Sequence, residues 1–249
     1  MPSVVLKSVG AHVGSATWSF CVGGARRAPW SWLQGPPPVR ELSPVRRTKS
    51  GRLSRNIPVQ AISLTTDGWL FLESGLEHEL MMLLDRLSGT VWLVGQPARL
   101  KWEDGVKHVP DLLSVDRDGA VTIWDARHPH RRDETFDVVS SRTAKACAEI
   151  GWGYVLFGGF PEVESLNLRW IAGARRPPEW LEPARATLRR VVEGDTTTVG
   201  DVLAADDGRG FLTSSMWHLV WTGELTMDLR APWGRSTAIA WATAEVGAP

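Results

Sequence analysis

The stretch that decides the fold reads HVPDLLSVDRDGAVTIWDAR, from His108 to Arg127. Two apolar runs flank Asp118-Gly119, a dipeptide typical of a two-residue hairpin turn. Because residues two apart in a strand point to the same face, Asp125 and Arg127 are expected to project together. Asp111 enters the sheet beside them. Two acids and a cation that meet at a strand end can hold a divalent metal against a phosphate.

Length and composition place the chain among globular proteins. It has 249 residues, of which 43% are hydrophobic, enough for two domains with cores of their own. Basic and acidic residues balance at 28 each, so net charge predicts no partner. Two distant cysteines, Cys21 and Cys147, fit a reducing cytosol. We find no signal peptide and no apolar run near the roughly 20 residues of a membrane span, so the chain is expected to be cytoplasmic and not membrane-bound.

Residues 1–58 are predicted to form a basic arm rich in Pro, Gly and Arg. Between Ala25 and Arg55 there are eight basic residues and one acid. Such an arm suits contact with DNA phosphates, and a solvated tail is the alternative. Trp18, Trp30 and Trp32 indicate that part of it packs on something. The residues expected to contact DNA are Arg46, Arg47, Lys49, Arg52 and Arg55.

Residues 59–162 are predicted to form a catalytic α/β domain around the central hairpin, with a mixed sheet covered by helices. Ser74 and Glu77 have the spacing of a capping box at a helix start. Helical periodicity predicts helices over residues 75–87 and 133–150. Apolar runs predict further strands over residues 59–64, 69–72, 91–94 and 153–157, and another segment that begins at Gln96-Pro97 and runs through Leu100 and Trp102. Asp104-Gly105 after it is a second signal for a two-residue hairpin turn.

Residues 163–249 have a different character. Helical patterns cover residues 166–172, 183–192, 198–205 and 216–222, with Thr213-Ser214-Ser215 expected to cap the last, and residues 224–229 read as a strand. Two short helices followed by a strand suggest a winged helix-turn-helix-like domain. Six acids and two arginines lie between Asp195 and Arg230. An acidic module binds phosphates poorly, so we expect it to dock a protein partner.

The succession of motifs resembles the TnsA-like endonuclease subunits of heteromeric transposases, within the PD-(D/E)xK restriction-endonuclease-like superfamily. The motifs are ESGLE at residues 73–77, Gln96-Pro97, HVPDLL, the D-x-R of Asp125 and Arg127, and SRTAKACAEIGW at residues 141–152. NLRWIAG and MWHLVWTGELTMDL extend the likeness, which covers roughly residues 60 to 232.

The resemblance implies a metal-dependent DNA endonuclease that works in cut-and-paste transposition. Such a subunit uses Mg²⁺ or Mn²⁺ and cuts the non-transferred strand of double-stranded DNA at the 5′ ends of the element. Its partners are a DDE-type transposase, which cuts the transferred strands, and an AAA+ ATPase regulator, which docks against the carboxy-terminal region.

Carried onto this chain, the resemblance makes Glu77, Asp111 and Asp125 the metal ligands. Glu77 has a second reading as the capping partner of Ser74, and Asp111 as a turn residue. Arg127 stands where relatives carry a lysine. Arginine does not give up its proton in proteins, so Arg127 can orient water or stabilise charge but cannot act as a base.

Three further residues are possible supports for this site. Glu73 is the substitute ligand for Glu77. Gln96 is either catalytic or bonded through its backbone in a structural role. His108 either touches phosphate or is a strand histidine with its hydrogen bonds satisfied. Because of Arg127, a catalytically silent adaptor that bridges transposase, AAA+ regulator and DNA remains an alternative function; a stand-alone winged-helix repressor conflicts with the acidic balance.

Overall fold

The computed structural model describes residues 16–46, 59–194 and 196–243. The chain divides into two compact units: unit 1 comprises Met1–Asp85 and Gly89–Gly159, and unit 2 comprises Arg86–Ser88 and Phe160–Pro249. The described residues form mixed β-sheets and six α-helices, which confirms the α/β class. None of the helices in these described ranges is long and apolar enough to cross a membrane.

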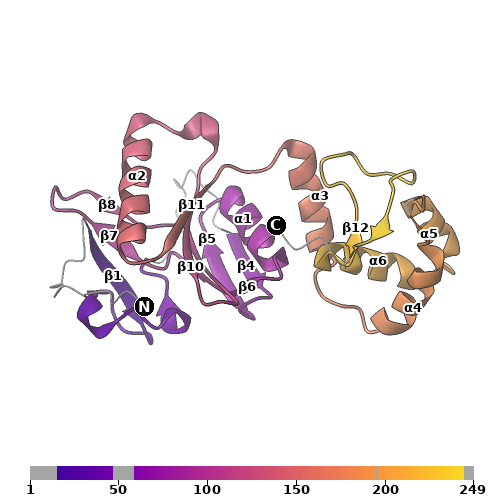
Figure 1. Cartoon of the computed structure of the whole chain (residues 1–249), viewed down its shortest axis with the longest axis horizontal. Coiled ribbons are helices and arrows are strands. Elements are labelled where there is room, and N and C mark those ends of the chain that lie inside the picture. Colours follow the sequence, from indigo (N-terminus) through magenta and orange to yellow (C-terminus); the bar gives the residue numbers. More distant parts are fainter. Residues whose placement is uncertain (1–15, 47–58, 195, 244–249) are drawn as a thin grey trace, which may run out of the picture. The chain divides into compact units, whose positions relative to one another are not determined.

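The predicted hairpin forms the centre of a four-stranded sheet in unit 1 (Figure 1). Its strand order is β11-β10-β9-β6, and only β10 and β11 run parallel. The strands are β6 (Thr90–Gly95), β9 (Leu112–Asp116), β10 (Val121–Ala126) and β11 (Gly153–Phe157). Gly119 takes a φ of +81° in the β9–β10 turn, a conformation that glycine adopts without strain.

A helical crossover makes the parallel pairing of β10 and β11 possible. Helix α2 (Glu134–Glu149) connects them and lies against β11. The Asp133 side chain caps α2 by accepting a hydrogen bond from the Phe136 N–H at 2.8 Å. The predicted helix over residues 133–150 is therefore confirmed, with Asp133 as the N-cap residue.

Helix α1 (Gly75–Arg86) follows a separate two-stranded sheet, β4 (Val59–Ser63) and β5 (Gly68–Leu72). The Asp85 carboxylate accepts hydrogen bonds from the Ser63 hydroxyl at 2.6 Å and the Leu64 N–H at 3.0 Å. These bonds connect the last turn of α1 to the β4–β5 turn. These bonds fix the C-terminal end of α1, and Glu77 lies in the first turn of the same helix.

Residues 16–46 do not form the predicted arm. They supply β1 (Thr17–Val22), β2 (Ala28–Pro29), β3 (Leu42–Ser43) and two short 3₁₀ helices, η1 (Trp32–Gln34) and η2 (Val39–Glu41). In a second sheet β1 pairs with β7 (Arg99–Lys101), which pairs with β8 (Lys107–His108). The prediction was wrong because it gave more weight to the Pro, Gly and Arg content of the segment than to the apolar residues around Trp18, which form β1. The rest of the predicted arm, residues 1–15 and 47–58, lies outside the described residues.

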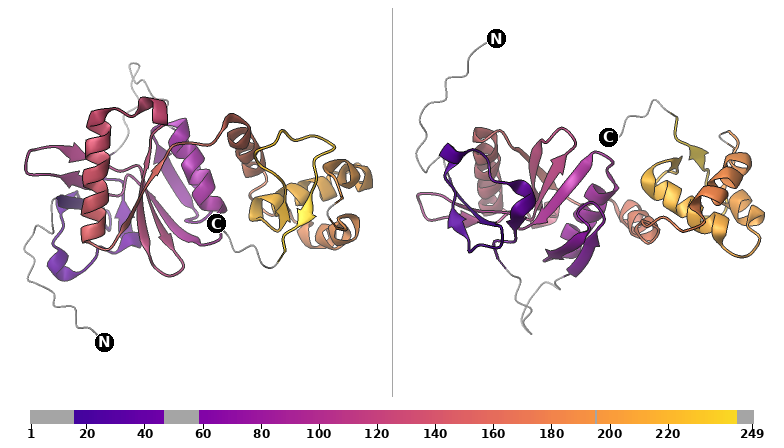
Figure 2. Two further views of the ribbon diagram at one scale, coloured as in Figure 1. Left: turned by 45° about the horizontal axis from the view of Figure 1, so that its top comes forward. Right: turned by 90° about the horizontal axis from the view of Figure 1, so that it is seen from below.

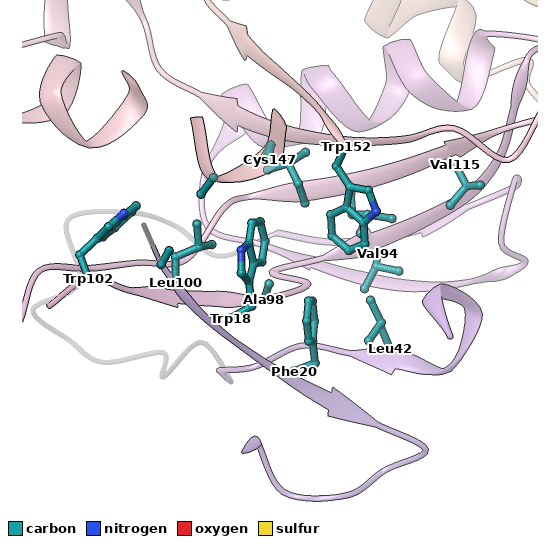
Figure 3. Close-up of a cluster of buried hydrophobic side chains, with 14 residues drawn as sticks. Trp18, Phe20, Leu42, Val94, Ala98, Leu100, Trp102, Val115, Cys147 and Trp152 are labelled. Carbon is teal, nitrogen blue, oxygen red and sulfur yellow. The ribbon is translucent and has the colours of Figure 1, made fainter. Parts of the chain in front are cut away.

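An aromatic cluster joins this second sheet to the rest of unit 1 (Figure 3). Trp18 and Phe20 are 1% and 2% exposed. The Trp18 ring centroid lies 5.6 Å from that of Trp152, which follows α2, and 6.2 Å from that of Trp32. Edge-to-face packing of this kind adds to the free energy gained by burying the rings.

Unit 2 is built around helix α6 (Phe211–Thr222). In Figure 2 the segments of unit 2 gather around it. They are α3 (Glu162–Ala172), α4 (Leu181–Val191), α5 (Val199–Ala205), and a two-stranded sheet of β12 (Leu225–Thr226) and β13 (Ala240–Trp241). Short helices followed by a small sheet agree with the predicted order, and the winged-helix assignment stays a prediction.

The predicted start of α6 was wrong. Thr213 and Ser214 lie inside the helix, whose N-cap residue is Gly210. Asp206 provides the capping oxygens instead, because its carboxylate accepts hydrogen bonds from the Gly210 N–H at 3.0 Å and the Thr213 N–H at 2.9 Å. Asp206, which lies before the helix, therefore binds the free N–H groups of the first turn that Thr213, Ser214 and Ser215 were expected to cap.

Candidate active site

Four acidic side chains line one cleft of about 600 Å³ in unit 1. They are Glu73, Glu77, Asp111 and Asp125. Glu73 lies between β5 and α1, Glu77 in the first turn of α1, Asp111 directly before β9, and Asp125 on β10. The structure thus brings together the acids that the sequence analysis selected on separate elements. Arg127 and His108 line the same cleft.

Glu77 has the capping role that its spacing from Ser74 predicts. Its Oε1 accepts a hydrogen bond from the Ser74 hydroxyl at 2.8 Å, and its Oε2 accepts one from the Glu73 N–H at 2.7 Å. The side chain is buried, and burial raises the pKa of its carboxyl. These contacts orient Glu77 toward the cleft through the helix start and do not exclude a role as a ligand.

Asp111 is anchored on β10 through its backbone and one carboxylate oxygen. Its N–H donates to the Trp124 carbonyl at 3.0 Å, and its Oδ2 accepts from the Ala126 N–H at 2.7 Å. Burial, followed by the negative charges of Glu77 and Asp125, raises the pKa of Asp111 well above its ordinary value. Within the described residues its Oδ1 accepts no hydrogen bond.

Asp125 is 2% exposed and lies at the centre of a hydrogen-bond chain. His108 Nε2 is 2.8 Å from its Oδ2 and 3.0 Å from its Oδ1. The Tyr154 hydroxyl donates to Oδ2 at 2.7 Å, and Ser140 Oγ lies 2.8 Å from the Tyr154 oxygen. One ring nitrogen of His108 is therefore bonded to Asp125, and the ring also borders the cleft, so both readings of His108 stay open.

Arg127 follows β10 and borders the cleft, as the D-x-R spacing predicts. Its Nε donates to the Arg131 carbonyl at 2.9 Å, and its guanidinium carbon lies 5.3 Å from the centre of the Phe136 ring. Among the described residues it forms no ion pair with the carboxylates. The Arg131 carbonyl and the Phe136 ring position the guanidinium. Because none of the described carboxylates of the cleft neutralises it, its positive charge can bind an anion there.

Basic side chains surround the acids. The cleft is also lined by Arg27, Arg46, Arg99, Lys107 and Arg131. Arg46 forms an ion pair with Glu73, whereas Arg99, Lys107 and Arg131 form none within the ranges that the structure describes. Of the five residues predicted to bind DNA, only Arg46 can be placed; Arg47, Lys49, Arg52 and Arg55 lie outside the described residues.

Gln96 takes part in the site through its backbone. Its N–H donates to the Asp111 carbonyl at 2.8 Å, and its carbonyl accepts from the Val45 N–H at 3.0 Å. Its φ is +47°, and both polar atoms of its buried amide lack a hydrogen-bond partner among the described residues. These contacts describe the structural role considered for Gln96, since they align the end of β6 with Asp111.

Sequence reasoning missed several residues of the site. Tyr154 and Ser140 were assigned only to a buried strand and a helix, and Arg99 and Lys107 were given no role. Tyr154 is the only tyrosine of the chain, in a strand that is otherwise apolar apart from Gly153, and that was the available signal. Lys107 and His108 lie together on β8, but no local pattern shows that β8 faces the acids.

The predicted metal site stays a prediction. In the described ranges no three His, Cys, Asp or Glu side chains are grouped as a set that could hold a metal ion. The donor chemistry nevertheless fits a hard divalent cation, because one oxygen of Asp111 has no hydrogen-bond partner in the described part of the chain and the carboxylates of Glu77 and Asp125 lie near it. Comparison with known proteins gives no match, either to a protein-family model or to a curated protein.

Proposed function

We propose that this chain is a metal-dependent DNA endonuclease, the subunit of a heteromeric cut-and-paste transposase that cuts the non-transferred strand at the element's 5′ ends. One observation carries the proposal: a cleft in unit 1 holds four carboxylates and is lined by six lysine or arginine side chains. Carboxylates that retain negative charge attract a divalent cation, and basic side chains around them attract the phosphates of a nucleic acid.

Asp111 and Glu77 are the residues that would hold Mg²⁺ or Mn²⁺. A bound ion would lower the pKa of a bound water and neutralise charge at the scissile phosphate. Asp125, which the resemblance also makes a ligand, is left out of this pair because its Oδ2 already accepts hydrogen bonds from Tyr154 and His108, and its Oδ1 lies 3.0 Å from the same His108 nitrogen. Arg127, which contacts the Arg131 carbonyl and the Phe136 ring, would stabilise the negative charge that develops on the phosphate.

The order of elements in unit 1 supports the resemblance on which the transposition role rests. Helix α1 precedes the antiparallel strands β6, β9 and β10, with β7 and β8 inserted between β6 and β9, and helix α2 and the parallel strand β11 come after them; this order is compatible with the proposed restriction-endonuclease-like core. Unit 2, with the acidic stretch between residues 195 and 230, is the proposed docking region for the AAA+ regulator. The DDE-type transposase is the proposed partner at the element ends.

The test combines the purified chain, the transposase of the same element, element-end DNA and Mg²⁺ or Mn²⁺. We expect 5′-strand cuts that require the metal and the wild-type chain. Strand-specific end labels identify which strand is cut. Absence of these cuts, with complexes still assembled, contradicts the nuclease proposal.

A silent adaptor is the second candidate, and one observation favours it. Arg127 cannot replace a lysine that acts as a base, and its Nε is engaged by the Arg131 carbonyl. An adaptor would bridge the transposase, the AAA+ regulator and DNA without cutting. It predicts that chains with and without an intact acid cluster support equal cleavage of the transferred strands and no cleavage of the opposite ones.

The cleft cations make a separate prediction about DNA binding. Replacing Arg99 with alanine is expected to weaken binding and to reduce the slope of log K against log salt by about 0.9, because one phosphate contact is lost. Fluorescence anisotropy at several salt concentrations measures the slope. Arg117→Ala is the matched control, since Arg117 is exposed in the β9–β10 turn and does not line the cleft. Equal slopes for Arg99→Ala and wild type would contradict DNA binding in this cleft.

A further inference from the structure

The hydrogen-bond chain that includes Asp125 and His108 has no role in the metal binding proposed for Asp111 and Glu77. It runs from Ser140 on α2 through Tyr154 on β11 and Asp125 on β10 to His108 on β8. The imidazole on β8 is therefore connected by hydrogen bonds to three other elements, β10, β11 and α2. His108 and Asp125 both line the cleft, and the histidine is the more exposed of the two, with a side chain 17% exposed against 3% for Asp125.

The bond to Asp125 determines which nitrogen of His108 carries a proton. A carboxylate only accepts hydrogen bonds, so Nε2 carries the hydrogen that points to Asp125. In the neutral ring Nδ1 is then an acceptor. Within the described residues Nδ1 forms no hydrogen bond, which leaves it available to a molecule in the cleft.

Tyr154 determines which group donates and which accepts in each hydrogen bond of the chain. Burial, followed by the charge of Asp125, raises the pKa of Tyr154, so its hydroxyl stays a donor. Because that hydroxyl donates to Asp125, the Ser140 hydroxyl donates to the Tyr154 oxygen in turn. Asp125 thus receives hydrogen bonds from two sides and keeps one orientation, which fixes the plane of the His108 ring. An acid that orients a histidine in this way is a recurring device in hydrolytic sites.

We propose that His108 is the general base of the phosphodiester hydrolysis, with Asp125 and Tyr154 as its positioning residues. This inference rests on the proposed function. It gives the site the proton acceptor that Arg127 cannot be. The attacking water forms a bond from its oxygen to phosphorus and gives its proton to His108 Nδ1. The bond from phosphorus to the leaving sugar oxygen breaks, and that oxygen takes a proton from solvent water. His108 then returns its proton to solvent.

The first test reads the tautomer of His108 and needs no catalysis. Nitrogen-15 NMR of the full chain at a pH where the ring is neutral is expected to show a protonated Nε2 and an unprotonated Nδ1. Asp125→Asn is expected to lose this preference, because an amide can also donate to Nε2. A wild-type ring protonated at Nδ1 would overturn the assignment.

The second test measures cleavage with Mn²⁺, the transposase and element-end DNA. His108→Ala is expected to lower kcat by about 10² to 10⁴ with little change in KM, and added imidazole is expected to restore part of the rate. His108→Gln can retain a donor toward Asp125 and lacks a base, so it should be equally slow. His130→Ala is the control, because His130 is exposed on η3 (Pro129–Arg131) and does not line the cleft.

The outcomes separate the two proposals. Full activity of His108→Ala or of His108→Gln, beside an active wild type, overturns the role of His108 and leaves the nuclease proposal intact. A slow His108→Ala variant that imidazole does not accelerate, beside a fast His108→Gln variant, shows a structural role and also overturns it. An inactive wild type in assembled complexes overturns the nuclease proposal itself, and the catalytic role of His108 with it.

Discussion

Asp111→Asn is expected to reduce cleavage at least about 100-fold and at the same time to raise the Tm of the chain at neutral pH. Asparagine keeps an oxygen for the Ala126 N–H but lacks the negative charge that would hold a cation. It also removes the repulsion of Asp111 by Glu77 and Asp125. Loss of activity with a gain in stability is expected when a carboxylate is needed for function although burial and neighbouring negative charges disfavour its charged form.

The stability gain depends on pH in a defined direction. The folded-state pKa of Asp111 is raised above its ordinary value of 3.8, so folding favours the protonated carboxyl. The favourable contribution of that carboxyl is fully present below the unfolded pKa and is lost as the pH rises through the folded pKa. Asparagine resembles the protonated form at every pH. The difference in Tm between variant and wild type should therefore vanish near pH 3 and grow toward neutral pH.

Calorimetry across this pH range measures the effect, and strand-cleavage assays measure activity on the same preparations. We expect an increase of at least about 2 °C at neutral pH, the shift that roughly 1 kcal/mol gives in a chain of this size. Asp118→Asn is the control, since Asp118 is exposed in the turn of the same hairpin. A large fall in Tm for Asp111→Asn would instead identify Asp111 as a structural turn residue.

Trp18→Ala is expected to destabilise unit 1 by about 3–5 kcal/mol, the usual range for removing a buried tryptophan. Trp18 is 1% exposed, and its ring packs against those of Phe20 and Trp152 (Figure 3) and of Trp32. The loss would leave a cavity where β1 meets the segment after α2. Such a change is a large part of the stability of a typical domain.

Urea unfolding followed by tryptophan fluorescence and circular dichroism measures this free energy. Leu33→Ala is the matched control, because Leu33 belongs to the same segment but is 68% exposed. We expect a change within about 0.5 kcal/mol for the control. A similarly small change for Trp18→Ala would contradict the finding that residues 16–46 are part of the folded core and would favour the arm that composition predicts.

The elements of unit 1 between residues 59 and 157 follow local rules, which is why they could be predicted. Asp118-Gly119 and Asp104-Gly105 mark turns whose glycines take positive φ, and Ser74 with Glu77 marks the start of α1. These signals involve residues a few positions apart. The position of residues 16–46 could not be predicted in this way, because β1 pairs with β7 across more than half of unit 1.

Sequence by itself determined the hairpin, the helices and the acids from which a site could be built, because turn chemistry, capping and periodicity act over a few residues. Only the tertiary structure decided which acids share a cleft and what Asp111 and Asp125 contact. Asp125 is bound by His108 and Tyr154, and Glu77 and Asp111 share a cleft with basic side chains of β7 and β8. These contacts join distant parts of the chain, and the free energy of each depends on burial and charge that arise only when the strands assemble.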